Sequence, residues 1–175
     1  MPSSADRHAI RRLCTDALLL TTALMLSYLE AVLPLQLLIP LPGFRLGLAQ
    51  LVITLTFFCV GRGDAAAVSL ARVMIMGLLF GNASSLLFSL CGSVLSYLGL
   101  WIGHALLRHR CSYIGLGVLC AALHNVGQLV AACLYDSGIL LTYLPVMLLT
   151  ATLFGAIGGM LLHLLIPRIK GGPIS

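Results

Sequence analysis

Long apolar runs alternate along the chain with short breaks that are rich in turn-forming residues. Six such runs can be delimited, and their bounds are 13–33, 46–60, 64–80, 84–107, 113–135 and 139–166. Glycine, asparagine, proline and basic residues occupy the breaks, and these residue types end helices or form turns. Most runs reach the roughly 17–25 residues that a helix needs to cross a bilayer. The pattern predicts an all-α membrane protein, a bundle of six transmembrane helices.

The composition excludes a water-soluble domain. The chain has 175 residues, of which 60% are hydrophobic and only 9% are charged. A soluble domain carries about 25% charged residues, so this chain has too little charge to cover a surface in water. Its net charge of +5 is spread too thinly to indicate nucleic-acid binding.

The basic residues instead mark the topology. If the N-terminus lies inside, the inner regions hold eight of the ten basic residues, Arg7, Arg11, Arg12, Arg62, Arg108, Arg110, Arg168 and Lys170. Such an excess on one side is typical of the cytoplasmic face. The sequence therefore predicts a cytoplasmic segment 1–12, a single six-helix domain over 13–166, and a cytoplasmic tail over 167–175.

The second apolar run is unusual because it is short and follows an apolar stretch broken by prolines. Pro40 and Pro42 prevent a regular helix there. An apolar, irregular outer loop is expected to bury itself against the helix ends. We interpret residues 34–45 as a plug or lid over the outer face.

Polar side chains inside the predicted helices are candidates for function, because a charge at the bilayer centre costs at least about 2.5–3.5 kcal/mol. Arg72 follows Asp64 by eight residues, which places it roughly 12 Å into the membrane from the cytoplasmic side. The other polar residues lie toward the outer half. The predicted ligand-binding set is Glu30, Arg45, Gln50, Arg72, Asn82, His124, Asn125 and Gln128. These residues either line a cavity that opens outward or form a structural polar cluster.

Other features support weaker hypotheses. His104 and His163 lie near cytoplasmic helix ends, where they could bind haem, a metal or a quinone, or simply meet lipid headgroups. Small residues recur at a spacing of four in Ala23, Ser27 and Ala31, and again in Gly155 and Gly159. This spacing lets helices approach closely, either within the bundle or against a partner. Asp16 either reaches the interface or pairs with Arg12.

The sequence lacks two motifs that would indicate an enzyme of nucleotide or diphosphate chemistry. It contains no GxxxxGK[ST] loop for ATP and no aspartate-rich motif for a magnesium diphosphate. The chain is therefore predicted not to be an enzyme, and neither a cofactor nor a metal is expected.

Several segments resemble the Gx transporter family, which is also described as heptaprenyl diphosphate synthase component I. They are Ser27–Glu30, Pro42–Gln50, Leu70–Val73, Leu79–Gly81 and His124–Leu129. The resemblance covers about residues 10–168, nearly the whole chain. Gln50 stands where the family usually has asparagine, a change that retains an amide.

The resemblance implies a role like that of the substrate-binding S components of energy-coupling factor (ECF) transporters. These are six-helix proteins that capture a small molecule at the outer face beneath a first extracellular loop. A coupling membrane subunit and two ATPases then drive transport. It also implies a multi-pass protein of the bacterial cytoplasmic (inner) membrane. The alternative is a non-catalytic membrane subunit associated with heptaprenyl diphosphate or menaquinone synthesis, or with a flavin-linked redox system.

Overall fold

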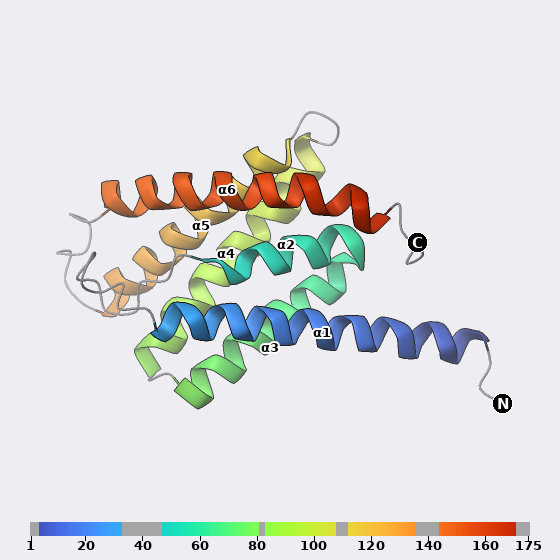
Figure 1. The fold of residues 1–175 in the computed structure, drawn as a ribbon. Helices are drawn as coiled ribbons and strands as arrows, with labels where there is room; N and C mark the ends of the chain where they lie inside the picture. Colours follow the sequence, from blue (N-terminus) through green and yellow to red (C-terminus); the bar gives the residue numbers. More distant parts are fainter. Residues whose placement is uncertain (1–3, 33–46, 81–82, 108–111, 136–143, 171–175) are drawn as a thin grey trace.

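The computed structural model describes residues 4–32, 47–80, 83–107, 112–135 and 144–170. Within these ranges the chain forms six α-helices and no strand (Figure 1). They are α1 (Ser4–Val32), α2 (Ala49–Cys59), α3 (Arg62–Phe80), α4 (Ala83–Leu107), α5 (Tyr113–Tyr135) and α6 (Leu144–Lys170). The all-helical prediction is confirmed.

Successive helices run in opposite directions between the two ends of the bundle (Figure 1). Five helices, all except α2, are long and apolar enough to cross a membrane. With its 11 residues, α2 extends only about 16 Å, short of the ~30 Å hydrocarbon core. A sixth crossing would therefore need residues that precede Gly47 as well. The first and last helices extend beyond their predicted ranges toward the chain ends, since α1 begins at Ser4 and α6 ends at Lys170.

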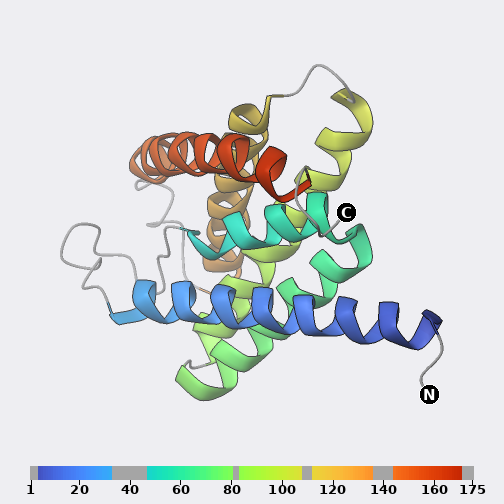
Figure 2. The ribbon, with the colours of Figure 1, turned by 45° about the vertical axis from the view of Figure 1, so that its right-hand side comes forward.

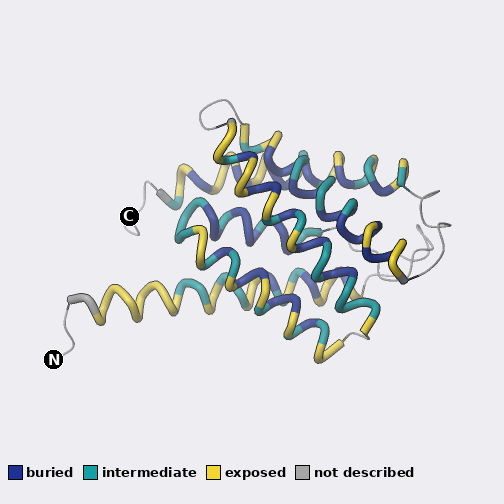
Figure 3. Tube along the Cα trace, turned by 180° about the vertical axis from the view of Figure 1, so that it is seen from behind, coloured by how far each residue is buried: buried dark blue, intermediate teal, exposed yellow. Residues whose placement is uncertain are grey.

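The surface of the bundle is apolar. Large hydrophobic side chains such as Leu18, Leu78, Leu134 and Leu149 are exposed on four different helices. In water such a surface would aggregate, whereas in lipid it is the expected outer face. Along the Cα trace of each helix, buried residues alternate with exposed ones (Figure 3). The long apolar helices and this exposed apolar surface indicate a multi-pass membrane protein.

Hydroxyl groups on the helices are largely satisfied within their own helix. Thr21, Thr22 and Thr152 each donate a hydrogen bond to the carbonyl oxygen four residues earlier. This arrangement lets a threonine face hydrocarbon without an unpaired polar atom.

Glycines set the close contact between α5 and α6, which cross in Figures 1 and 2. A Cβ atom added to Gly159 would lie 2.4 Å from the Cα atom of Ile114, and one on Gly155 would lie 2.8 Å from that of Val118. The backbones therefore touch, which only glycine permits. The Gly155–Gly159 pattern serves packing inside the bundle. Of the other small residues, Ala23 and Ser27 also face inward, and Ala31 is exposed.

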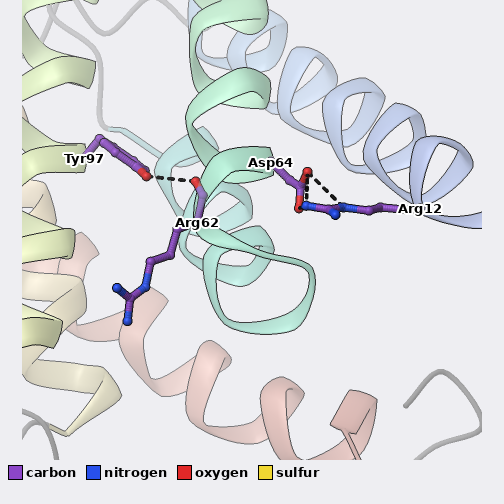
Figure 4. Close-up of polar contacts among 4 residues, drawn as sticks. All are labelled: Arg12, Arg62, Asp64 and Tyr97. Atoms are coloured by element: carbon purple, nitrogen blue, oxygen red, sulfur yellow. Dashed lines mark hydrogen bonds and ion pairs between the residues drawn. The ribbon is translucent and has the colours of Figure 1, made fainter. Parts of the chain in front are cut away.

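At the end of the bundle where α1 begins, ion pairing joins α1 to α3. The guanidinium of Arg12 contacts both carboxylate oxygens of Asp64, at 2.6–3.1 Å (Figure 4). The hydroxyl of Tyr97 donates to the backbone oxygen of Arg62 at 2.8 Å and so joins α4 to α3 (Figure 4). Sequence neighbours alone suggested Asp16 as the partner of Arg12, whereas the ion pair that forms is with Asp64, 52 residues away.

The predicted topology can be tested with single cysteines. Ala83 and Ser112 are exposed at opposite ends of the bundle, at the start of α4 and just before α5. In a cysteine-free background, a membrane-impermeant maleimide should label Ala83→Cys in intact cells. It should label Ser112→Cys only after the membrane is permeabilised. The reverse pattern, or equal labelling of both, would contradict cytoplasmic termini with six crossings.

Candidate functional site

Polar side chains are buried inside the bundle near the end of α1, at the start of α2, in the first half of α4 and in the middle of α3 and α5. Those that are buried and not simply bonded to a backbone carbonyl of their own helix are Ser27, Glu30, Gln50, Ser69, Arg72, Ser89, Ser93, Ser96, His124, Asn125 and Gln128. In a bilayer each unsatisfied polar group costs several kcal/mol, so their partners decide what the cluster does.

Arg72 holds three helices together. It lies on α3 and is only 2% exposed. Its Nη1 atom donates to the hydroxyl of Ser27 on α1 at 3.2 Å, and Nη2 donates to the hydroxyl of Ser93 on α4 at 2.5 Å. A buried guanidinium needs such oxygen partners, because its charge cannot be dropped by deprotonation.

Glu30 joins α1 to the start of α2. Its Oε1 atom accepts a hydrogen bond from the backbone N–H of Leu48, just before α2 begins. The first N–H groups of a helix have no partner within the helix and carry partial positive charge. The Glu30 carboxylate therefore stabilises this helix start. Gly47, with a φ of 82°, makes the turn that brings the chain there.

On α5, His124 and Gln128 form one pair, whose Nε2 atoms lie 3.2 Å apart. Two glycines surround the imidazole. A Cβ atom on Gly92 of α4 would lie 2.9 Å from the His124 ring, and one on Gly47 would lie 3.7 Å from it. The turn before α2 and helix α4 therefore both approach His124 of α5, α4 through Gly92, the neighbour in sequence of the Ser93 that binds Arg72.

Asn125 is turned toward α6. Its Nδ2 atom donates to the backbone oxygen of Met147 at 2.6 Å. In the second turn of α6 the hydroxyl of Thr150 shares this acceptor, at 2.9 Å. This contact fixes the first turns of α6 against α5, so the geometry gives Asn125 a structural bond.

Three buried polar side chains have atoms without a hydrogen-bond partner among the described residues. They are both amide atoms of Gln50, the Oε1 atom of Gln128 and the hydroxyl of Ser89. The two glutamines are each only 4% exposed. Native structures rarely leave buried polar atoms unpaired, and each exception calls for an explanation such as a ligand or a water.

The hydrogen bonds of the described site residues form separate groups, in which Glu30 bonds to Leu48, Arg72 to Ser27 and Ser93, and His124 to Gln128. Gln50 lies on the first turn of α2, two residues after Leu48. Arg45, Asn82 and the predicted lid at 34–45 lie outside the described residues. Whether the set binds a ligand stays a prediction.

The sequence reasoning did not include the serines that complete this cluster. Ser27 precedes Glu30 by three residues, and Ser89, Ser93 and Ser96 follow one another at spacings of four and three on α4. Residues at these spacings share one face of a helix. This polar stripe in an otherwise apolar helix was a signal that could have identified them.

The two histidines of the metal or haem hypothesis contact aromatic rings. The His104 ring lies edge-on to Phe57 and Phe58, with centroids 5.4 and 5.3 Å away, and His163 lies 6.1 Å from Tyr113. Among the described residues no group of three histidine, cysteine or acidic side chains is placed to hold a metal.

Comparison with known proteins gives one finding. A family model described as heptaprenyl diphosphate synthase component I matches residues 19–165, most of the chain. Neither the curated proteins nor the solved structures include a significant match.

Proposed function

The chain belongs to the heptaprenyl diphosphate synthase component I family, and from that premise we propose that it is a substrate-capture subunit of the bacterial cytoplasmic membrane. It binds a small molecule in the outer half of the helix bundle, as an S component of an ECF-type transporter does. Glu30, Gln50, Arg72, His124 and Gln128 surround that ligand.

The observation that carries this proposal is the buried polar cluster with its unpaired amides. A cluster that served only to hold helices together would be expected to satisfy its own hydrogen bonds. Gln50 and Gln128 do not satisfy theirs within the described residues. Intramembrane polar residues that face the bundle interior commonly mark a substrate path.

The depth of the cluster favours capture from outside. If the N-terminus lies inside, as the basic residues predict, His124 is midway along α5, Gln128 is one turn nearer the outer end, and Gln50 is at the outer start of α2. A short helix that begins at membrane depth resembles the broken helices that form substrate sites in transporters. The sequence carries no P-loop, so energy for transport would come from a coupling membrane subunit and separate ATPases.

The family description supports a second candidate, a membrane subunit of a prenyl diphosphate synthase. The chain has only five acidic residues and no aspartate-rich motif. In that role it would leave the magnesium-dependent chemistry to another component and would anchor or assist that component at the membrane.

Affinity capture separates the two candidates. The tagged full-length protein is extracted from native membranes in mild detergent, and its partners are identified by mass spectrometry. We expect a coupling membrane subunit with two ATPases, absent from a parallel capture of an unrelated membrane protein. Recovery of a prenyl diphosphate synthase subunit, with no ATPase, would replace the capture role by the accessory one.

A further inference from the structure

An apolar groove lies between α3 and α4. Its volume is about 200 Å³, and its walls come from residues 66–73 of α3 and 90–98 of α4. Apart from Ser69, Ser93 and Tyr97, the residues that line it are alanine, valine and leucine. The two serines are buried and belong to its floor. The space is therefore bounded almost entirely by hydrocarbon.

The groove lies between two contacts that join α3 to α4. Toward the end of α3, the side chain of Leu86 packs on Gly77, where an added Cβ atom would lie 2.2 Å from Leu86 Cδ1. Near the start of α3, the Tyr97 hydroxyl donates to the backbone oxygen of Arg62 at 2.8 Å. Between these contacts several of the facing side chains are only alanine or serine, and they leave the space unfilled. The groove is therefore bounded at both ends.

The side of the groove opens onto the lipid-facing surface. Its rim consists of Leu70, Val94 and Leu98, which are all exposed. These side chains continue the exposed apolar surface of the bundle, so lipid is the medium that meets the groove. An empty groove would deprive its lining of van der Waals contacts. Because packing rather than exclusion of water drives association within a membrane, a chain that restores these contacts binds favourably.

The dimensions of the groove select a single chain rather than a helix. Residues 66–73 and 90–98 extend only about 10–12 Å along their helices. A helix with its side chains is itself about 10–12 Å across, so a partner's transmembrane helix would not fit between the two closing contacts. An apolar cavity of about 150 Å³ holds a benzene molecule. The groove therefore has room for a segment of one lipid chain.

We propose that the groove between α3 and α4 binds an acyl chain of a phospholipid from the cytoplasmic leaflet. In the predicted orientation the groove extends from near the cytoplasmic end of α3 to about the middle of the membrane, the depth of that leaflet's chains. The bound chain packs α3 against α4 and covers Ser93, whose hydroxyl accepts a hydrogen bond from Arg72 at 2.5 Å. This lipid site is independent of both candidate functions.

A photoreactive phospholipid tests the proposal in a bilayer. The full-length protein is reconstituted into vesicles of phosphatidylethanolamine and phosphatidylglycerol. A fraction of the phosphatidylethanolamine carries a diazirine in one acyl chain. After illumination, mass spectrometry locates the labelled residues. We expect labelling of the buried floor residues Ser69 and Ser93, in addition to exposed residues such as Leu78, because only a chain inside the groove reaches the floor.

Two neighbouring alanines of α3 provide a variant and its matched control. Ala66 lines the groove, so Ala66→Phe should fill it and abolish the labelling of Ser69 and Ser93, while the labelling of Leu78 stays unchanged. Ala67 is exposed and does not line the groove. Ala67→Phe should therefore retain the labelling of the floor.

The other outcomes contradict the proposal. Labelling confined to exposed residues of the wild type would mean that no chain enters the groove. Floor labelling that persists in Ala66→Phe would mean that the label arrives by another route. If an unlabelled polyprenol abolishes the floor labelling and an equal amount of unlabelled phospholipid does not, the groove binds an isoprenoid chain and the acyl assignment is wrong. Val94→Phe, at the exposed rim, repeats the test if Ala66→Phe does not fold.

Discussion

Replacing Arg72 by methionine is expected to destabilise the protein by about 3 kcal/mol or more, the usual cost of removing one member of a buried charged set. The change removes the bonds from α3 to Ser27 on α1 and to Ser93 on α4. It also leaves Glu30 as the remaining charge of the cluster, at 3% exposure. Titration with a denaturing detergent, followed by circular dichroism, measures the loss.

A double-mutant cycle with Glu30→Gln shows whether the two charges are coupled. Ser27, which binds Arg72, lies one turn before Glu30 on the same face of α1. We therefore expect Arg72→Met with Glu30→Gln to be less destabilised than the sum of the single variants, by about 0.5–3 kcal/mol. Strict additivity would mean that Glu30 acts only on the start of α2. The single Arg72→Met variant should also fail to retain ligand, because α1, α3 and α4 are no longer fixed around it.

Replacing Gly159 by alanine is expected to separate α5 from α6 and to cost about 1–3 kcal/mol, as overpacking usually does. The added Cβ atom would lie 2.4 Å from Ile114 Cα and 2.7 Å from the backbone oxygen of Tyr113. Both neighbours are backbone atoms, so no side-chain rotation can relieve the clash. The same detergent titration measures the effect.

Gly115→Ala is the matched control, on α5 but outside the α5–α6 contact. Gly115 is an exposed glycine of α5, and a Cβ atom there would meet nothing within 4 Å. Its stability should stay unchanged or rise by up to about 1 kcal/mol, since alanine favours a helix over glycine. Equal losses in both variants would mean that the α5–α6 contact is not the reason for Gly159.

The functional alternatives depend on different parts of the molecule. Capture depends on the polar interior around Gln50 and His124, whereas an accessory role would depend on exposed surfaces that contact another component. Interior variants such as Arg72→Met therefore also separate the two candidates, because they should abolish ligand retention without directly altering an exterior docking surface.

The sequence by itself determined that the chain is an all-α membrane protein and roughly where its helices lie. Apolar runs of about 20 residues can satisfy their backbone only as helices in lipid, so composition and run length carry that information. The unusual second run also pointed to a short helix, and α2 is short in the structure. The sequence also identified Glu30, Arg72 and His124 as buried candidates, because a polar residue within an apolar run can be recognised from the sequence alone.

Partners were decided only by the tertiary structure. Asp64 rather than Asp16 meets Arg12 because the first turn of α3 lies beside α1 (Figure 4). Ser27 and Ser93 meet Arg72, and Asn125 turns to α6, because of how three-dimensional packing orients each helix about its own axis. The unpaired amides of Gln50 and Gln128 could not be predicted from the sequence either. Whether an amide finds a hydrogen-bond partner depends on which side chains and backbone groups surround it in the folded structure.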